Sequence, residues 1–107
     1  MPATFPETTP FVLSGAEADI YTVTTGKKAI KIEIWLCNTS TSGVVVTLYL
    51  IPSGGTSSAA NTIYNDTIPA KRSIPMMINC NLSAGGKLRG FGSAASVVGV
   101  RVAAVEV

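Results

Sequence analysis

The segments AIKIEIWLCN (29–38) and VVVTLYLIP (44–52), separated by TSTSG (39–43), indicate the fold class of this chain. Apolar and other residues alternate in both segments, which is the period of a β-strand with two different faces. One face of the first segment would hold Ile30, Ile32, Ile34 and Leu36, and the opposite face Lys31, Glu33, Trp35 and Cys37. One face of the second would hold Val44, Val46, Leu48 and Leu50, and the opposite face Val45, Thr47, Tyr49 and Ile51. The Ser/Thr/Gly break predicts a β-hairpin whose aliphatic face is covered by the rest of the chain.

The remainder of the chain repeats this pattern in shorter pieces. Strands are expected within 11–13, 17–25, 62–68, 73–82, 87–91 and 96–107, with turn residues between them and no helical periodicity. Pro75 cannot donate a ladder hydrogen bond, so the strand that contains it should start at a sheet edge or at a bulge. The last strand changes phase, which predicts either a β-bulge near Ala103 and Ala104 or a terminus that leaves the sheet.

These strands predict an all-β fold, an antiparallel β-sandwich or jelly roll of seven to eight strands. The domain would occupy 11–107, preceded by an extended N-terminal arm at 1–10, because MPATFPETTP holds three prolines and no periodicity. The arm would be either disordered or laid along a neighbouring subunit. The predicted core comprises Ile32, Ile34, Leu36, Val46, Leu48, Ile78, Val98 and Val100.

Composition suggests that this domain meets other protein chains. At 107 residues it can form one modest core, yet 47% of its residues are hydrophobic and only 13% are charged. So few charges would leave apolar surface for another subunit to cover. The net charge of +2 is small, and the basic pairs Lys27–Lys28 and Lys71–Arg72 lie beside turns, so no nucleic-acid partner is expected. No run reaches transmembrane length, and no membrane partner is expected.

Residues with catalytic or metal-binding chemistry are scarce. The sequence contains no His, and its carboxylates fall on separate predicted elements, so we expect no enzyme, no metal site and no cofactor. Cys37 and Cys80 lie inside predicted strands and are read either as two buried free thiols or as a disulfide, which would require neighbouring strands.

Four aromatic residues are the candidate interface: Phe5, Phe11, Trp35 and Tyr49. The two phenylalanines could anchor the arm. Trp35 and Tyr49 face the same side of the predicted hairpin, where they could pack against another strand or subunit or could form a platform on which a sugar stacks.

Three turn and strand-end motifs carry a resemblance to a known family. They are Ile20-Tyr21-Thr22-Val23 followed by Gly26-Lys27, then Cys37-Asn38-Thr39-Ser40, and then Leu50-Ile51-Pro52-Ser53-Gly54-Gly55 with Ala59-Ala60-Asn61. They resemble motifs of the small, jelly-roll-like β-sandwich proteins of tailed-bacteriophage virions, over about residues 19–90. Thr24-Thr25 departs from the family, where Pro-Ala is commoner.

The resemblance implies a function without catalytic residues. It implies a virion component that is usually oligomeric, most often a homotrimer, and it leaves open whether the protein lies on the capsid or on the tail. The short single domain, the proline-rich arm, the high apolar fraction and the absence of catalytic groups favour a structural protein that decorates or cements the capsid and is assembled in the host bacterial cytoplasm. Its partners would be further copies of itself and the major capsid protein or tail proteins. The alternative is a tail or baseplate adhesion module that binds a host receptor or saccharide.

Overall fold

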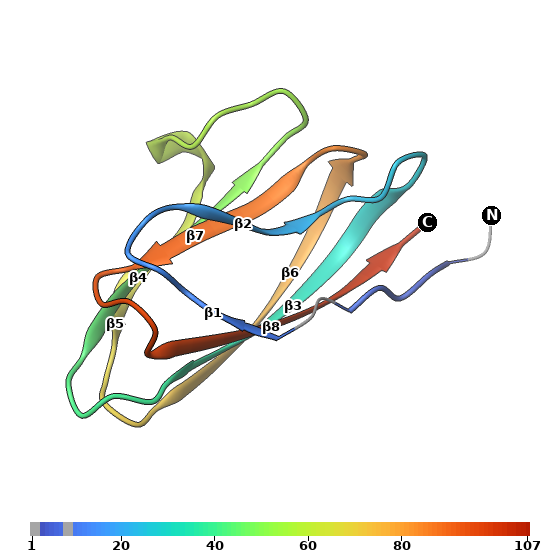
Figure 1. The fold of residues 1–107 in the computed structure, drawn as a ribbon. Helices are drawn as coiled ribbons and strands as arrows, with labels where there is room; N and C mark the ends of the chain where they lie inside the picture. Colours follow the sequence, from blue (N-terminus) through green and yellow to red (C-terminus); the bar gives the residue numbers. More distant parts are fainter. Residues whose placement is uncertain (1–2, 8–9) are drawn as a thin grey trace.

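The computed structural model describes residues 3–7 and 10–107 and forms a sandwich of two four-stranded antiparallel sheets (Figure 1). The strands are β1 (Phe11–Val12), β2 (Ala18–Thr22), β3 (Lys28–Asn38), β4 (Val44–Ile51), β5 (Thr62–Ile68), β6 (Ser73–Ser83), β7 (Lys87–Gly92) and β8 (Val98–Glu106). One short 3₁₀ helix, η1 (Ala59–Asn61), lies in the loop between β4 and β5. The expected all-β sandwich of seven to eight strands is therefore confirmed.

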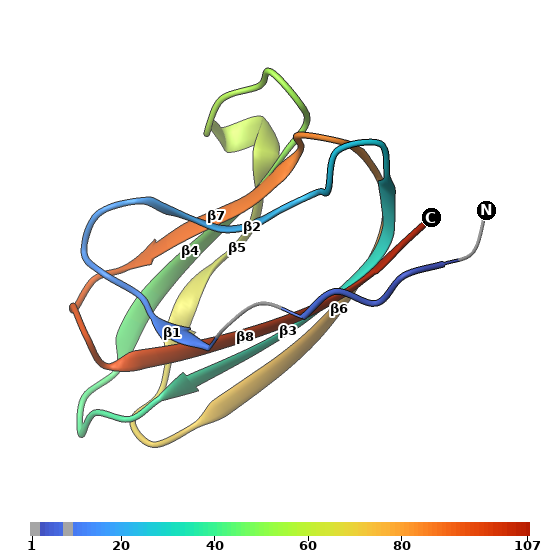
Figure 2. The ribbon, with the colours of Figure 1, turned by 45° about the vertical axis from the view of Figure 1, so that its right-hand side comes forward.

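The strand order is that of a jelly roll. The first sheet, sheet A, has the order β1-β8-β3-β6, and the second, sheet B, has the order β2-β7-β4-β5. The pairs β1/β8, β2/β7, β3/β6 and β4/β5 are those of one long hairpin wrapped into two layers. Figure 2 shows the two sheets as separate layers, and the buried core residues lie between them.

Aliphatic side chains from both sheets fill the space between the layers. Of the predicted core residues, Ile32, Ile34, Leu36, Val46, Leu48, Val98 and Val100 are fully buried. Ile78 is only half-buried because β6 is the edge strand of sheet A, although its side chain still packs on the core. Burial of each such side chain contributes about 1.5–3 kcal/mol, so the inward rows of β3, β4 and β8 dominate stability.

The predicted hairpin between 29–38 and 44–52 does not form. β3 pairs with β6 and β8, whereas β4 pairs with β5 and β7, so the two strands lie in different sheets and face each other across the core. The reason is that both strands have one strongly apolar face. Stacking buries those two faces against each other, whereas a side-by-side hairpin would leave both of them to be covered by other strands.

The Asn38 side chain stabilises the connection between β3 of sheet A and β4 of sheet B. This side chain is fully buried, and its amide nitrogen donates to the carbonyl oxygens of Ser42 and Ile68, at 2.9 Å each. Its Oδ1 accepts from the backbone N–H of Ser40 at 3.0 Å and from the hydroxyl of Ser40 at 2.7 Å. These bonds join the β3–β4 connection to the end of β5 and satisfy polar groups that the corner would otherwise bury unpaired.

Two predicted strand phases need correction. The register shifts in β3 between Ala29 and Lys31, so Ala29 is buried and Ile30, predicted to face the core, is exposed. The bulge expected near Ala103 and Ala104 is absent, because β8 keeps one phase and buries both Ala104 and Glu106. The irregularity thus lies on β3 and not on β8.

The described part of the N-terminal arm pairs with β8 of its own chain. Thr4 stands opposite Glu106 and Glu7 opposite Ala103, and the N–H of Ala104 donates to the carbonyl oxygen of Pro6 at 2.9 Å. The arm therefore covers the edge of β8 that β1 is too short to reach, which leaves fewer ladder groups unpaired. Figure 1 shows the arm running beside β8. The division at residue 10 remains a prediction.

Two further expectations concern β3 and β6. Pro75 does lie on an edge strand, since β6 ends the order of sheet A. Both cysteines are free, but Cys37 is exposed on the outer face of β3, so the expectation of two buried thiols is wrong for Cys37. Cys80 is half-buried, and burial raises the pKa of its thiol.

Candidate interaction surface

The outer face of sheet A is the candidate functional site, and its side chains form rows across the strands. Residues that pair directly in an antiparallel sheet point to the same face. The successive rows are Val12, Gly99, Cys37 and Ser73; then Arg101, Trp35 and Pro75; then Glu7, Ala103, Glu33 and Met77; then Val105, Lys31 and Asn79. We call these residues, together with Phe5, the Trp35 face.

Phe5 belongs to this face by register. Thr4 and Glu7 pair with Glu106 and Ala103, so the same register places Phe5 opposite Val105. Side chains two apart on an extended strand share a face, and Glu7 points outward toward Arg101. Phe5 therefore points outward as well, and 72% of it is exposed.

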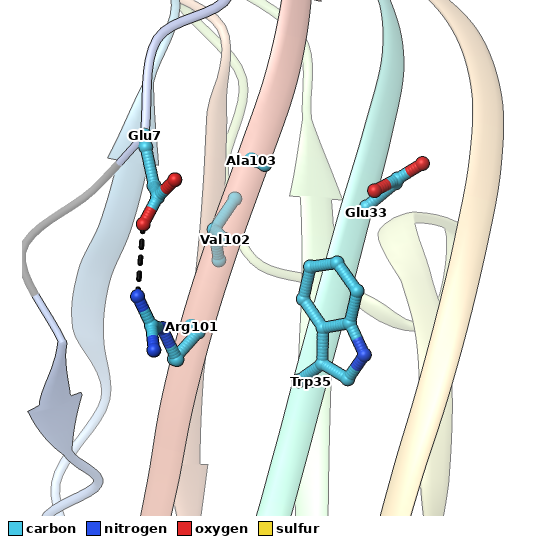
Figure 3. A pocket seen from close by; sticks show the side chains of 6 residues that line it. All are labelled: Glu7, Glu33, Trp35, Arg101, Val102 and Ala103. Atoms are coloured by element: carbon cyan, nitrogen blue, oxygen red, sulfur yellow. Dashed lines mark hydrogen bonds and ion pairs between the residues drawn. The ribbon is translucent and has the colours of Figure 1, made fainter.

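Small side chains on β8 produce two hollows in the Trp35 face. One hollow, of about 520 Å³, is lined by Glu7, Glu33, Trp35, Arg101, Val102 and Ala103, and Figure 3 shows the small Ala103 side chain between Glu7 and Glu33. A second, of about 360 Å³, is lined mainly by apolar residues around Gly99: Pro10, Val12, Trp35, Cys37, Val100 and Arg101. A Cβ added at Gly99 would meet nothing within 4 Å. Trp35 and Arg101 line both hollows.

The charges on this face are few and at least partly exposed. Arg101 pairs with Glu7 at 2.9 Å, and Lys31 pairs with Glu33 at 3.4 Å. In Figure 3 the Glu7–Arg101 pair lies along the arm side of β8, while Trp35 and Glu33 lie on β3. Exposed pairs of this kind contribute about 0–1 kcal/mol, so both remain available to rearrange toward a partner.

The structure separates the four aromatic residues predicted as an interface. Phe5 and Trp35 both lie on the Trp35 face, and Trp35 is 45% exposed. Phe11 lies in β1 opposite Val100, and its side chain is outside what the structure describes. Tyr49 lies on β4 in sheet B, where its ring contacts Phe91 at 6.4 Å between centroids. The predicted Trp35–Tyr49 platform is therefore wrong, because β3 and β4 belong to opposite layers.

Sequence reasoning missed the residues that shape the hollows. Gly99, Ala103 and Arg101 share one face of the last strand, and the small–large–small pattern is visible in the sequence. It becomes informative only when Trp35 is known to stand beside Arg101. The exposed Met77 lies at the far end of the same face and could not be placed before the pairing of β3 with β6 was known.

Glu106, treated in the sequence as an isolated carboxylate, is instead buried between the two layers. Its carboxylate accepts a hydrogen bond from the Tyr21 hydroxyl and another from the backbone N–H of Thr24, at 3.1 Å. Burial opposes its ionisation, but these bonds and the charge of Lys27 outweigh burial and hold the pKa of Glu106 below its usual value. Burial and the same carboxylate raise the pKa of Tyr21. The network joins β8 to β2 and has a structural role.

The described residues contain no arrangement that suggests cofactor chemistry. Among residues 3–7 and 10–107, no three His, Cys, Asp or Glu side chains gather closely enough to hold a metal ion. Within the same ranges, no helix has the length and apolar character needed to cross a membrane.

Comparisons with known proteins give likenesses in fold alone. No protein-family model matches the chain. No curated protein matches it in sequence. Among solved structures, it is similar to a chain from the disulfide-linked pili of Bacillus endospore appendages, with a TM-score of 0.64 and 17% identity over 97% of this chain and 86% of that one. It is also similar to a chain of the T13 IBDV viral particle, with a TM-score of 0.53 and 16% identity over 98% of this chain.

The two neighbours differ in how much of them is matched. This chain spans 31% of the length of the viral-particle chain but most of the length of the pilus chain. Both neighbours come from assembled structures, a pilus and a virus particle. At such low identity the likeness establishes the sandwich fold and carries no residue role.

Proposed function

We propose that this chain is a non-enzymatic structural protein of a tailed-phage virion, an oligomeric protein that decorates or cements the capsid. The observation that carries the proposal is the Trp35 face, an apolar and hollowed sheet surface that the described part of the chain leaves uncovered. Contiguous apolar surface of this kind is typical of protein–protein contacts. The motif resemblance supplies the phage virion, and the pilus and virus-particle neighbours support an assembly role.

The experiment localises the protein in virions and then tests a substitution on the Trp35 face. Gold-labelled antibody or cryo-EM should find the chain on capsids in many copies. The Trp35→Ser variant should lose most capsid occupancy, because it removes the largest side chain that lines both hollows of the surface through which the protein would assemble, while Tyr49→Ser on the opposite sheet should bind normally. Absence of the chain from purified virions, or equal occupancy of the two variants, would overturn the proposal. Native mass measurement tests the homotrimer, which rests on the resemblance.

A second candidate is a tail or baseplate module that binds a saccharide. It is favoured by the larger hollow, where Trp35 stands beside the carboxylates of Glu7 and Glu33. An aromatic ring beside hydrogen-bonding groups is the usual composition of a sugar site. A glycan array separates the two functions: a specific saccharide bound by the native protein and lost in Trp35→Ser supports the adhesion module, and the decoration protein predicts no such ligand.

A further inference from the structure

Two copies of the Trp35 face complement each other when they are stacked with the order of the rows reversed. Consider two copies stacked with their sheet A faces in contact and their strands antiparallel, related by a two-fold axis that runs across the strands. Each strand then lies over its own counterpart and the order of the rows is inverted. With the axis midway between Arg101 and Ala103, the Arg101 row of one copy lies over the Ala103 row of the other.

Charges match in this arrangement. Arg101 of one copy lies over Ala103 of the other, whose small side chain separates Glu7 and Glu33 in the same row (Figure 3). A guanidinium thus enters a hollow that has a carboxylate on either side. Opposite charges placed face to face favour association and fix the register of an interface.

Apolar groups match in the same arrangement. The row that holds Val12 and Gly99 lies over the row of Phe5 and Val105. Phe5, exposed in its own chain, therefore lies over Val12 of the second copy, which lines the apolar hollow around Gly99. Met77, which is 60% exposed, lies over Pro75 of the other copy. One two-fold axis thus satisfies the charged and the apolar features together.

We propose that the Trp35 face binds a second copy of this chain through an isologous contact in which Arg101 of each copy enters the Ala103 hollow of the other and Phe5 packs on Val12 at the border of the Gly99 hollow. Stacked sheets keep their strands within about 30° of one another, which this geometry respects. The inference names the partner of the surface on which the proposed function rests, but it does not depend on a virion. In a homotrimer, such a contact would join subunits of two different trimers.

A charge-exchange experiment tests the contact. Arg101→Glu alone places a carboxylate against Glu33 of the second copy, and Glu33→Lys alone places an ammonium group against Arg101. Each variant should therefore self-associate more weakly than the native protein by about tenfold or more. A one-to-one mixture of the two should associate again, because the introduced carboxylate of one variant then meets the introduced ammonium of the other, while the native Arg101 and Glu33 meet at the second, symmetry-related contact. Sedimentation of each protein and of the mixture measures this, and thermal melts check that both variants fold.

A steric test uses the open hollow. Gly99→Leu should fill it without strain and weaken association, as should Phe5→Ser, whereas Tyr49→Ser on sheet B should not. A native mass of two or six chains, together with renewed association in the mixture of the two charge variants, supports the contact. A mass of three chains only, native association by the charge variants, or a mixture that stays dissociated overturns it. Pairing without any presence in virions would support this inference and overturn the proposed function.

Discussion

The outer faces of the two sheets have opposite character. On sheet B, Arg89 pairs with both Glu17 and Asp19, at 3.2 and 2.9 Å, and Lys87 also pairs with Asp19. On the Trp35 face the two ion pairs stand apart, and Phe5, Val12, Trp35 and Met77 are exposed around the hollows. Sheet B has exposed apolar residues as well, Val45 and Ile63, but they lie on β4 and β5, away from the charged network of β2 and β7.

Under the proposed function, one fold would supply a solvated side and an assembly side. Polar side chains that satisfy one another within the chain are suited to water, whereas an apolar hollow gains free energy only when another surface fills it. The inward rows of both sheets are mainly aliphatic. The difference in character therefore lies in the outward rows, which contribute less to folding than the inward rows do.

The largest expected effect comes from the inward row beneath the Trp35 face. Ile34 is fully buried, and Ile34→Asp removes about 1.5–3 kcal/mol of burial and also buries an unpaired charge, so this variant should yield no soluble folded protein. Its sequence neighbour Glu33 points outward, and Glu33→Ala should melt within a few degrees of the native protein. Circular dichroism melts compare the two, and similar melting of both variants would contradict the facing of β3.

A moderate effect is expected where the two sheets are joined. Glu106→Gln exchanges a charged acceptor of the Tyr21 and Thr24 hydrogen bonds for a neutral one and should cost about 1.5–3 kcal/mol of unfolding free energy at pH 7. Folding lowers the pKa of Glu106. The contribution of its ionised carboxylate to the free energy of unfolding is therefore complete above the ordinary pKa of a Glu side chain, and it is lost as the pH falls through the folded-state pKa.

Urea unfolding at several pH values tests this pH dependence of the free energy of unfolding. The native protein and Glu106→Gln should differ at neutral pH and converge in acid, where Glu106 is protonated. Asp66→Asn, at an exposed carboxylate outside the Trp35 face, is the matched control and should follow the native protein. A gap between the native protein and Glu106→Gln that stays constant with pH would show that ionised Glu106 does not stabilise the fold.

The smallest effect is expected on the outer face of sheet B. Lys87→Ala removes one partly exposed ion pair, with Asp19, and should lower stability by less than about 1 kcal/mol, since Arg89 still pairs with that carboxylate. It should also leave self-association unchanged, because the Trp35 face is on the other sheet. Denaturant titration and sedimentation measure both properties. Weaker association in Lys87→Ala would remove the contrast drawn between the two outer faces.

Local sequence pattern was sufficient to predict the strands and most of the core. Alternation with period two is a local property, so residues such as Ile32, Leu48 and Val100 reveal their facing without knowledge of their neighbours. The same reasoning placed Pro75 on an edge, because a missing N–H is a property of the residue itself. The candidate aromatics Phe5 and Trp35 could likewise be chosen for size and position.

Strand neighbours, by contrast, follow from tertiary structure, and the site depends on them. Period two cannot distinguish a hairpin of β3 and β4 from two strands stacked across a core, because both bury the same face; the choice rests on pairings distant in sequence and on the Asn38 corner. The Trp35 face brings together the arm, β1, β8, β3 and β6, whose register fixes every row. The hollows at Gly99 and Ala103 and the buried position of Glu106 could not be predicted locally, because they depend on the strand registers that backbone hydrogen bonding sets.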